Sequence, residues 1–442
     1  MSTLKAGASG STAATSRRIA GLALPALVVL AAEPLYVLVD TAVVGHLGSV
    51  PLAAVAVGGT VLTMAAWLGT ILAYGTTGRA ARRFGSGDRT AAVQEGLQAS
   101  WLAFSAGIVI AIAMQVVAGP LARALAGNPE IAGEAAQWMR VAAIGAPGLL
   151  LAAAGNGWMR GVQDTRRPLY FVLGANLLSA ALCPILVYPA GLGLVGSAIA
   201  NAVAQTVAGA CFAVALLREE INWRPRIRVI GEQLRMGRDL LIRGGAFQLS
   251  FLSATTVAAR FGTATIAGHQ IAMQLWFFTA LVLDAVAIAA QSLIGATLGA
   301  GDAAGARALA RRIGFIGLVC GVAFAVVIAA GAGVVPRLFS SDAAVLDQAG
   351  VAWPWFVAMQ PVAGLVFALD GVLIGAGDVR YLRDLTVVAA LGFFLPAIWT
   401  AYVLDWGLAG IWAGLTLFVV VRCVALLLRL RTGGWAVVGA VR

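Results

Sequence analysis

The amino-acid sequence repeats itself at a constant offset of 214 in residue number, with no insertion or deletion between the two copies. The recurring positions are mostly glycine, proline and charged residues: Gly48 recurs as Gly262; Gly85, Gly87 and Asp88 as Gly299, Gly301 and Asp302; Pro147 as Pro361; Gly161, Asp164 and Arg166 as Gly375, Asp378 and Arg380; Gly193, Leu194 and Gly196 as Gly407, Leu408 and Gly410. Such self-similarity indicates duplication of a structural unit. In an apolar chain, duplicated units usually enclose a binding site.

The apolar content of the chain indicates that the repeated unit is a bundle of membrane-spanning helices. Of 442 residues, 61% are hydrophobic and 11% are charged, which is more apolar surface than one soluble core can bury. Many apolar runs reach the roughly 20 residues that a hydrocarbon core of about 30 Å requires. We expect an all-α polytopic membrane protein with twelve transmembrane helices in two six-helix lobes: residues 19–44, 52–78, 93–118, 137–158, 168–189, 194–217, 238–260, 264–297, 308–332, 350–374, 382–404 and 408–430.

The internal repeat is predicted to be parallel, because an interval of six spans returns the second copy to the same side of the membrane. The N-terminal lobe, with helices 1–6, is expected at residues 1–217, a cytoplasmic linker at 218–237, and the C-terminal lobe, with helices 7–12, at 238–442. The linker segment Glu219–Asp239 fits either a short amphipathic helix on the inner surface or an irregular solvated loop.

The net charge of +11 follows the pattern of a membrane protein and not that of a nucleic-acid-binding surface. Arginines gather in alternate loops, for example Arg82 and Arg83 after the second span and Arg311 and Arg312 after the eighth. By the positive-inside rule both termini are cytoplasmic, and we expect a multi-pass protein of the plasma (inner) membrane. The lipid bilayer is the partner that this pattern predicts, without nucleic acid, and the chain is expected to be a monomer.

Glycine-rich turns, cysteines and histidines have simple structural interpretations. The turns 84–88 and 298–302 follow no strand, so we interpret them as helix caps and not as phosphate cradles. Four cysteines inside predicted helices lack the spacing of a metal or redox pair and are interpreted as small apolar fillers: Cys183, Cys211, Cys320 and Cys423. Both histidines, His46 and His269, are interpreted as hydrogen-bonded structural residues.

Carboxylates inside predicted spans are the first candidates for function, since ionisable groups are expensive in a bilayer. Glu33 and Asp40 are separated by two helical turns, so they share one face of the first helix with Tyr36. Pro25 and Pro34 interrupt the hydrogen bonds of the same helix and predict a hinge there. Asp40 is either a proton-coupling or cation-coupling group together with Glu33, or a structural carboxylate bonded to Tyr36 or to an amide.

Polar residues on other helices extend this pattern differently in the two lobes. In the N-terminal lobe a polar cavity is predicted from Tyr36, Asn156, Asn176, Asn201 and Gln205. At the offset of 214, Glu33, Asp40 and Asn176 become Phe247, Ala254 and Ala390, so the first lobe is the predicted ion-handling half. The C-terminal lobe has its own polar candidates, namely Gln270, Gln274, Asp284, Gln291 and Asp370. Asp370 fits helix packing or an inner gate, and both functional and structural roles stay open for Asp284.

A segment of the first helix resembles a known family. Its residues Glu33-Pro34-Leu35 and Val39-Asp40-Thr41-Ala42-Val43-Val44-Gly45-His46-Leu47-Gly48, followed by Gly268-His269-Gln270, Ala290-Gln291 and Leu369-Asp370-Gly371, are similar to the multidrug and toxic compound extrusion (MATE) transporters of the DinF-like branch. The resemblance implies two lobes that alternate between inward-open and outward-open states and export organic compounds in exchange for protons or sodium ions. It assigns the coupling ion to Asp40, the bending proline to Pro25 and a neighbouring polar role to Asn176. Some members carry a second aspartate where this chain has Ala180.

The leading hypothesis is a proton-coupled antiporter that exports amphipathic or cationic organic compounds. A sodium-coupled exporter of the same family and a flippase for lipids or lipid-linked precursors are the alternatives. The flippase is disfavoured because the sequence predicts no Arg or Lys in the middle of a helix, except Arg140. No enzyme, cofactor or metal site is predicted apart from the coupling H+ or Na+, because the histidines are far apart and the acidic residues form no cluster.

Overall fold

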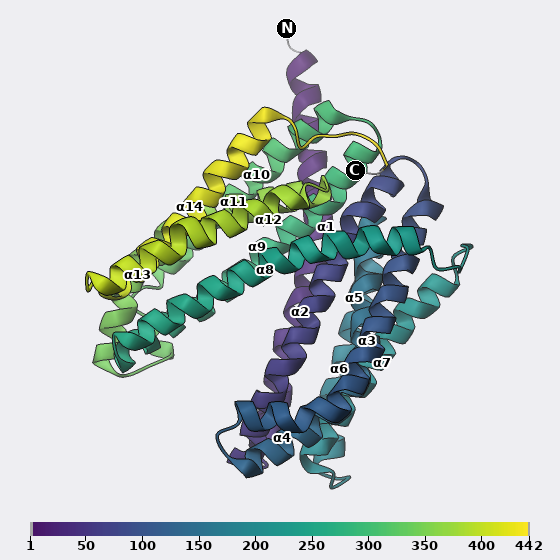
Figure 1. Cartoon of the computed structure of the whole chain (residues 1–442). Helices are drawn as coiled ribbons and strands as arrows, with labels where there is room; N and C mark the ends of the chain where they lie inside the picture. The colour runs from purple at the N-terminus through teal and green to yellow at the C-terminus, as the bar shows by residue number, and fades with distance from the viewer. Residues whose placement is uncertain (1–2, 441–442) are drawn as a thin grey trace. The chain divides into compact units, whose positions relative to one another are not determined.

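The computed structural model describes residues 3–440, with side chains from residue 15 onward, and this part of the chain contains helices and no strand (Figure 1). The long helices are α1 (Thr3–Gly45), α2 (Ser49–Gly85), α3 (Arg89–Leu125), α4 (Pro129–Ala142), α5 (Ala146–Gly161), α6 (Arg166–Val187), α7 (Gly193–Leu217), α8 (Ile227–Arg260), α9 (Thr263–Gly299), α10 (Ala303–Ala330), α11 (Ala343–Gly375), α12 (Val379–Val388), α13 (Leu395–Val403) and α14 (Gly407–Thr432). Three short elements complete them: η1 (Ala143–Gly145), η2 (Pro336–Leu338) and the π-helical η3 (Ala389–Phe394). The predicted lobe ends at residues 1–2 and 441–442 lie outside the described residues.

The chain forms two compact units, which we call the N-lobe and the C-lobe. The N-lobe comprises Leu24–Gly237. The C-lobe combines Arg238–Arg442 with the beginning of α1 up to Ala23. Within the C-lobe, the Arg312 guanidinium on α10 donates to the Ser16 hydroxyl of α1 at 2.8 and 3.2 Å. α1 therefore belongs to both units, and the division falls between Ala23 and Leu24, next to Pro25.

The internal repeat is visible in the backbone as well as in the sequence. Five pairs of positive φ angles occur at the same offset of 214: Gly48 (132°) and Gly262 (115°), Gly87 (85°) and Gly301 (83°), Gln163 (64°) and Gly377 (72°), Gly191 (66°) and Asp405 (54°), and Gly193 (52°) and Gly407 (59°). The repeat thus preserves conformation even where the residue type differs, which supports the predicted duplication.

The glycine-rich turns of the two lobes act as helix caps, as the sequence predicts. Asp88 accepts a hydrogen bond from the Ala91 amide at 2.7 Å, and Asp302 accepts one from the Gly305 amide at 2.7 Å. Each interaction satisfies a free amide at the first turn of a helix. These turns hold the beginnings of α3 and α10.

Close contacts between helices also repeat, because glycine lets two backbones approach. A Cβ atom at Gly107 would lie 2.7 Å from the Pro147 nitrogen. The corresponding atom at Gly321 would lie 2.9 Å from the Pro361 Cα. Both distances are shorter than real Cβ contacts, so α3 and α5 in the N-lobe, like α10 and α11 in the C-lobe, depend on glycine at the contact.

Eleven segments of the described chain are long and apolar enough to cross a membrane, and they correspond to eleven of the predicted spans. Two of them are interrupted: η1 separates α4 from α5, and η3 separates α12 from α13. Pro147 and Pro396 follow these interruptions, where a missing amide donor disturbs the helical hydrogen bonds. The remaining predicted span lies in α8, which is a continuous helix but carries charged residues through its first half.

The linker segment combines the two predicted conformations. Residues 220–226 are irregular, and Ile227 begins α8, so the amphipathic part is continuous with the following span. The segment is attached to the N-lobe by ion pairs from Arg79 to Glu232 at 2.8 Å and from Arg89 to Glu219 at 2.5 Å. Gln98 accepts from the Arg226 amide at 2.6 Å. The linker is therefore a fixed part of the N-lobe surface.

Candidate functional site: a polar cavity in the N-lobe

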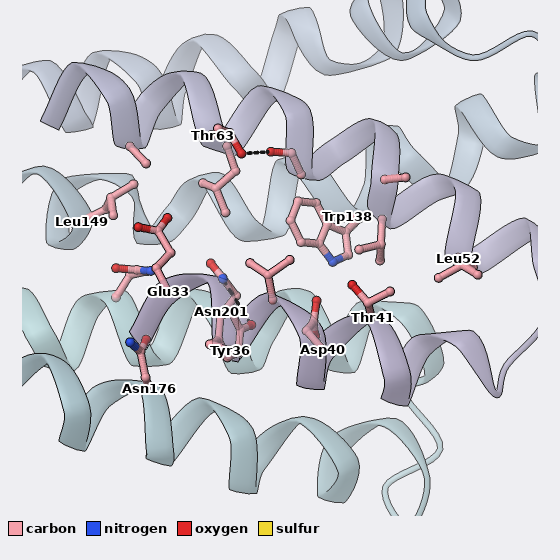
Figure 2. Close-up of a pocket in the computed structure, with 17 residues that line it drawn as sticks. Glu33, Tyr36, Asp40, Thr41, Leu52, Thr63, Trp138, Leu149, Asn176 and Asn201 are labelled. Atoms are coloured by element: carbon pink, nitrogen blue, oxygen red, sulfur yellow. Dashed lines mark hydrogen bonds between the residues drawn. The ribbon is translucent and has the colours of Figure 1, made fainter. Parts of the chain in front are cut away.

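A cavity of about 470 Å³ lies within the N-lobe and is lined by residues from α1, α2, α4, α5, α6 and α7 (Figure 2). It brings together six of the polar residues singled out in the sequence: Glu33, Tyr36, Asp40, Asn176, Asn201 and Gln205. The rest of the lining is mostly apolar and includes the Trp138 indole. A mostly apolar cavity with a few converging polar groups is typical of a small-molecule site.

The Asp40 carboxylate is buried, with 5% of the residue exposed, and it is bound by neutral donors. Its Oδ1 accepts from the Ser197 hydroxyl at 2.7 Å and from the Cys183 thiol at 3.1 Å. The Ser197 oxygen in turn accepts from the Trp138 Nε1 at 3.2 Å. Among the described residues, no Lys, Arg or His forms an ion pair with this carboxylate.

Helical spacing explains why these groups meet. On α1, Tyr36 and Asp40 lie one turn apart, and on α7, Ser197 and Asn201 lie one turn apart. The Asn201 amide donates to the Tyr36 hydroxyl at 3.2 Å, one turn from the Ser197 to Asp40 hydrogen bond. Two polar residues of α1 therefore pair with two polar residues of α7. Gln205, one further turn along α7, also lines the cavity.

Three members of this site were missed in the sequence analysis: Ser197, Cys183 and Trp138. The interpretation of Cys183 as an apolar filler was wrong, because its thiol donates to the buried carboxylate. Ser197 had a usable signal, since it precedes Asn201 by one turn on the same helical face. In the structural alternative Asp40 would bond to Tyr36 or to an amide, but its hydrogen-bond donors among the described residues are a hydroxyl and a thiol.

Glu33 and Asn176 lie at the other end of the cavity from Asp40 (Figure 2). Glu33 is exposed, whereas Asp40 is buried. The two carboxylates of α1 therefore have different surroundings, although both line one cavity. Pro34 follows Glu33, and both Pro34 and Pro25 lie inside the continuous helix α1. Either proline removes one backbone hydrogen bond from the helix that carries the carboxylates.

Asn156 does not extend the polar cavity, contrary to the sequence prediction. It is 9% exposed on α5 and does not line the cavity, and its side-chain oxygen has no hydrogen-bond partner among the described residues. Its neighbours explain the position: Gly155 packs against Phe212, and Gly157 packs against the Ala73 backbone. Asn156 therefore lies where α5 packs closely against its neighbouring helices.

Comparison with known proteins gives a consistent result over nearly the whole chain. The family model described as MatE matches residues 25–185 and 245–403. The chain is 34% identical to Protein DETOXIFICATION 44, chloroplastic, of Arabidopsis thaliana, over 94% of this chain and 83% of the relative. It is 30% identical to DNA damage-inducible protein F of Escherichia coli (strain K12), over 92% of this chain and 90% of that protein.

The chain belongs to the MATE family of transporters. A solved structure described as the outward-facing conformation of a multidrug resistance MATE family transporter of the MOP superfamily has the same fold, with a TM-score of 0.83. The sequences are 23% identical, and the match covers 95% of each chain. Together with the eleven apolar spans, these similarities show a multi-pass membrane protein.

The polar candidates of the C-lobe are not among the residues that line the N-lobe cavity, and their surroundings differ from one another. Gln270 and Gln274 are exposed on α9, Asp284 is half-buried, and Gln291 is buried with no hydrogen-bond partner among the described residues. His269 was expected to be hydrogen-bonded, but neither ring nitrogen has a partner among the described residues. The ring instead packs against Trp412, at 5.9 Å between centroids, whereas His46 contacts the Ala42 carbonyl at 2.7 Å.

Asp370 of this MATE protein has surroundings that the sequence analysis did not foresee. Its Oδ2 accepts from Arg243 of α8 and from Arg422 of α14, both at 2.5 Å. Arg422 is 3% exposed inside α14, so the prediction that Arg140 is the single candidate for a mid-helix cation was wrong. The argument against phosphate-bearing cargo loses its basis, because it depended on that absence.

Metal ligation has no obvious site in the described part of the chain. No group of three or more His, Cys, Asp or Glu side chains there could hold a metal ion. The N-lobe cavity offers carboxylate, hydroxyl and amide groups, which bind a proton or form hydrogen bonds to a ligand.

Proposed function

We propose that this MATE transporter is a proton-coupled antiporter that exports amphipathic or cationic organic compounds by alternating access, with Asp40 as the coupling group. The observation that carries the proposal is a buried carboxylate with neutral donors inside a cavity of about 470 Å³. Because no fixed cation among the described residues favours its ionised form, this carboxylate is suited to take up and release a proton during transport.

The change of charge gives the substrate a different affinity in each state. An ionised Asp40, together with Glu33 in the same cavity, attracts a cationic or amphipathic compound from the cytoplasm. A proton taken up from outside removes this attraction and releases the compound. Such differential affinity is the only way in which the ion can drive the conformational equilibrium. One pH unit supplies about 1.4 kcal/mol per proton, enough for about tenfold accumulation.

Protons are favoured over sodium ions by the chemistry of the donors. The Cys183 thiol lies 3.1 Å from Asp40 Oδ1 and donates to it. Hard cations prefer oxygen ligands, and a thiol occupies one position that a sodium ion would need. The family resemblance admits either ion, so sodium remains the alternative to be tested.

The movement is proposed to occur about α1. This helix belongs to both lobes, and Pro25 follows the point at which it passes from one to the other. Because Glu33 and Asp40 lie on the same helix, a change in the protonation of Asp40 acts directly on the helix that bends. We further propose a monomer in the plasma (inner) membrane with both termini cytoplasmic, as the arginine-rich loops indicate.

Reconstitution in liposomes tests the proposal. With an imposed pH gradient, the wild type is expected to accumulate a fluorescent organic cation, and Asp40→Asn is expected to abolish the gradient-driven part. Asp347→Asn is the matched control, because it makes the same change at an exposed position of α11. Equal export by Asp40→Asn and the wild type would refute the coupling assignment, and export driven by sodium alone would favour the sodium-coupled alternative.

A further inference from the structure

The C-lobe contains a buried cluster with more positive than negative charge, which we call the arginine pair. Arg243 and Arg422 both donate to the same oxygen of Asp370. The exposed fractions of the three side chains are 12%, 4% and 9%. Two guanidinium groups and one carboxylate carry a net charge of +1, which is unusual because buried charges are normally matched.

The arginine pair has unused hydrogen-bonding capacity. The Nε atoms of Arg243 and Arg422 have no hydrogen-bond partner among the described residues, and neither does Oδ1 of Asp370. A guanidinium has five N–H donors in a planar fork, which matches the two oxygens of a carboxylate or phosphate. The unpartnered donor of Arg422, a side chain more than nine-tenths buried, lies at a site with surplus positive charge and points to an anionic ligand.

The internal repeat shows that this cluster is not a requirement of the scaffold. At the offset of 214, the N-lobe has Val29 in place of Arg243 and Ala208 in place of Arg422. If the charges served only to hold the helices of one lobe together, the other lobe would need a substitute. It packs without charges at these two positions.

A row of aromatic rings continues from the arginine pair to an exposed position on α9. The Phe247 ring lies 4.7 Å from the Arg422 guanidinium carbon and 5.3 Å from that of Arg243. Phe247 stacks on Phe251, and Phe251 contacts Phe277, which is 50% exposed. Aromatic rings beside guanidinium groups form a surface for a flat apolar body that carries an anionic group at one end.

We propose that the arginine pair binds a carboxylate or phosphate group attached to an aromatic, amphipathic substrate. This inference rests on the proposed export function and adds to it an anion-binding site in the C-lobe. Arg243, the most exposed of the three charged residues, forms the entrance, and Arg422 holds the group more deeply.

Rhodamine B and its ethyl ester provide a direct test, because they share an aromatic cation and differ in the free carboxylate. Binding is measured by fluorescence anisotropy with full-length protein in phosphatidylcholine nanodiscs. Arg243→Gln is expected to weaken rhodamine B binding about tenfold and ester binding less than twofold, since a bidentate charged contact is lost only for the acid. Arg243→Lys should restore part of the difference. Because this binding needs no gradient, it can fail while coupled export of cations succeeds, or succeed while export fails.

The choice of Arg243→Gln keeps the fold testable, since Arg422 and Asp370 then form a balanced pair. Equal weakening for the acid and the ester would mean a structural role and overturn the proposal. A second measurement needs no variant: inorganic phosphate should displace rhodamine B from the wild type and leave the ester bound. Failure of phosphate to compete would also overturn it.

The same anionic chemistry could come from a lipid headgroup. Nanodiscs containing phosphatidylglycerol separate the two sources. If the pair takes its anion from the soluble substrate, rhodamine B binding stays within twofold of its value in phosphatidylcholine. If phosphatidylglycerol weakens rhodamine B binding in the wild type but not in Arg243→Gln, the anion site stands and its ligand is the headgroup, which overturns the assignment to cargo.

Discussion

Asp40 of the N-lobe and Asp370 of the C-lobe are both buried carboxylates, yet they have opposite surroundings. Asp40 accepts from a hydroxyl and a thiol, whereas Asp370 accepts from two guanidinium groups. A fixed cation beside a carboxylate favours its ionised form, and neutral hydrogen-bond donors supply no such opposite charge. The position of an acidic residue in a membrane helix thus says less about its role than the charges beside it.

The two surroundings arose on one scaffold. The backbone conformation repeats at five left-handed positions, but Asp40 corresponds to Ala254 and Asp370 to Asn156. The duplicated fold therefore preserves helix ends and close glycine contacts, while the polar interior differs between the lobes. The predictions below test whether this division between a common scaffold and different interiors holds.

The largest expected effect is the removal of the C-lobe carboxylate. Asp370→Ala leaves two buried guanidinium groups without a counter-charge and should lower the free energy of unfolding by about 3–5 kcal/mol. Asp40→Ala removes a carboxylate that has no ion-pair partner among the described residues, so we expect a change of less than about 1.5 kcal/mol. Thermal unfolding of both variants in detergent measures the difference. Equal destabilisation would mean that the two sites are energetically alike.

A smaller and symmetrical effect is expected from the glycine contacts that the lobes share. Gly107→Ala and Gly321→Ala each place a Cβ against the backbone of the facing helix. Overpacking of this kind should cost about 1–3 kcal/mol in either lobe. Gly59→Ala is the control, because a Cβ there meets no atom within 4 Å. A large cost in one lobe and none in the other would contradict a common scaffold.

The smallest effect concerns the linker, whose carboxylates are paired like Asp370 but lie nearer to water. Hydrogen bonds from Arg89 and Arg79 hold the pKa of Glu219 and of Glu232 below their usual values. A lowered pKa stabilises the folded protein above the unfolded pKa of about 4.3, and this stabilisation is lost as the pH falls through the folded value.

Glu219→Gln and Glu232→Gln should therefore each cost about 0.2–1 kcal/mol at pH 7, with screening by solvent keeping the effect small. The difference in melting temperature from the wild type should shrink as the pH falls below the unfolded pKa of about 4.3 and vanish once the pH is below the lowered folded pKa. Glu220→Gln is the control, since Glu220 is exposed and forms no ion pair in the described part of the chain. A difference that grows on acidification would show that the ion pairs are not its cause.

Sequence reasoning predicted the scaffold well because its signals are local. The constant repeat offset, the length of the apolar runs and the capping turns can each be read along the chain without knowing which helices meet. Polar residues noted inside separate spans likewise include six side chains that the cavity brings together. One local feature was misjudged. The sequence analysis began the seventh span at residue 238, whereas α8 begins at Ile227 and includes the charged segment before that residue.

The remaining parts of the two sites depend on contacts between distant helices. Serine and cysteine are ordinary residues in apolar spans. The contacts of Ser197 and Cys183 with Asp40 become evident only when α6 and α7 pack beside α1. Arg243 on α8 and Arg422 on α14 are far apart in the sequence, and their shared carboxylate lies on a third helix, α11. Spacing along one helix cannot show such convergence.

The division of α1 between the lobes has a consequence for biosynthesis. All the residues of the N-lobe have been synthesised once Gly237 is added, so this half can assemble while translation of the rest continues. The C-lobe must wait, because it includes both the first helical turns and α14, the last long helix of the described chain. Ser16 meets Arg312 only after most of the chain has been added. The beginning of the nascent chain therefore remains without its final partners for most of the synthesis.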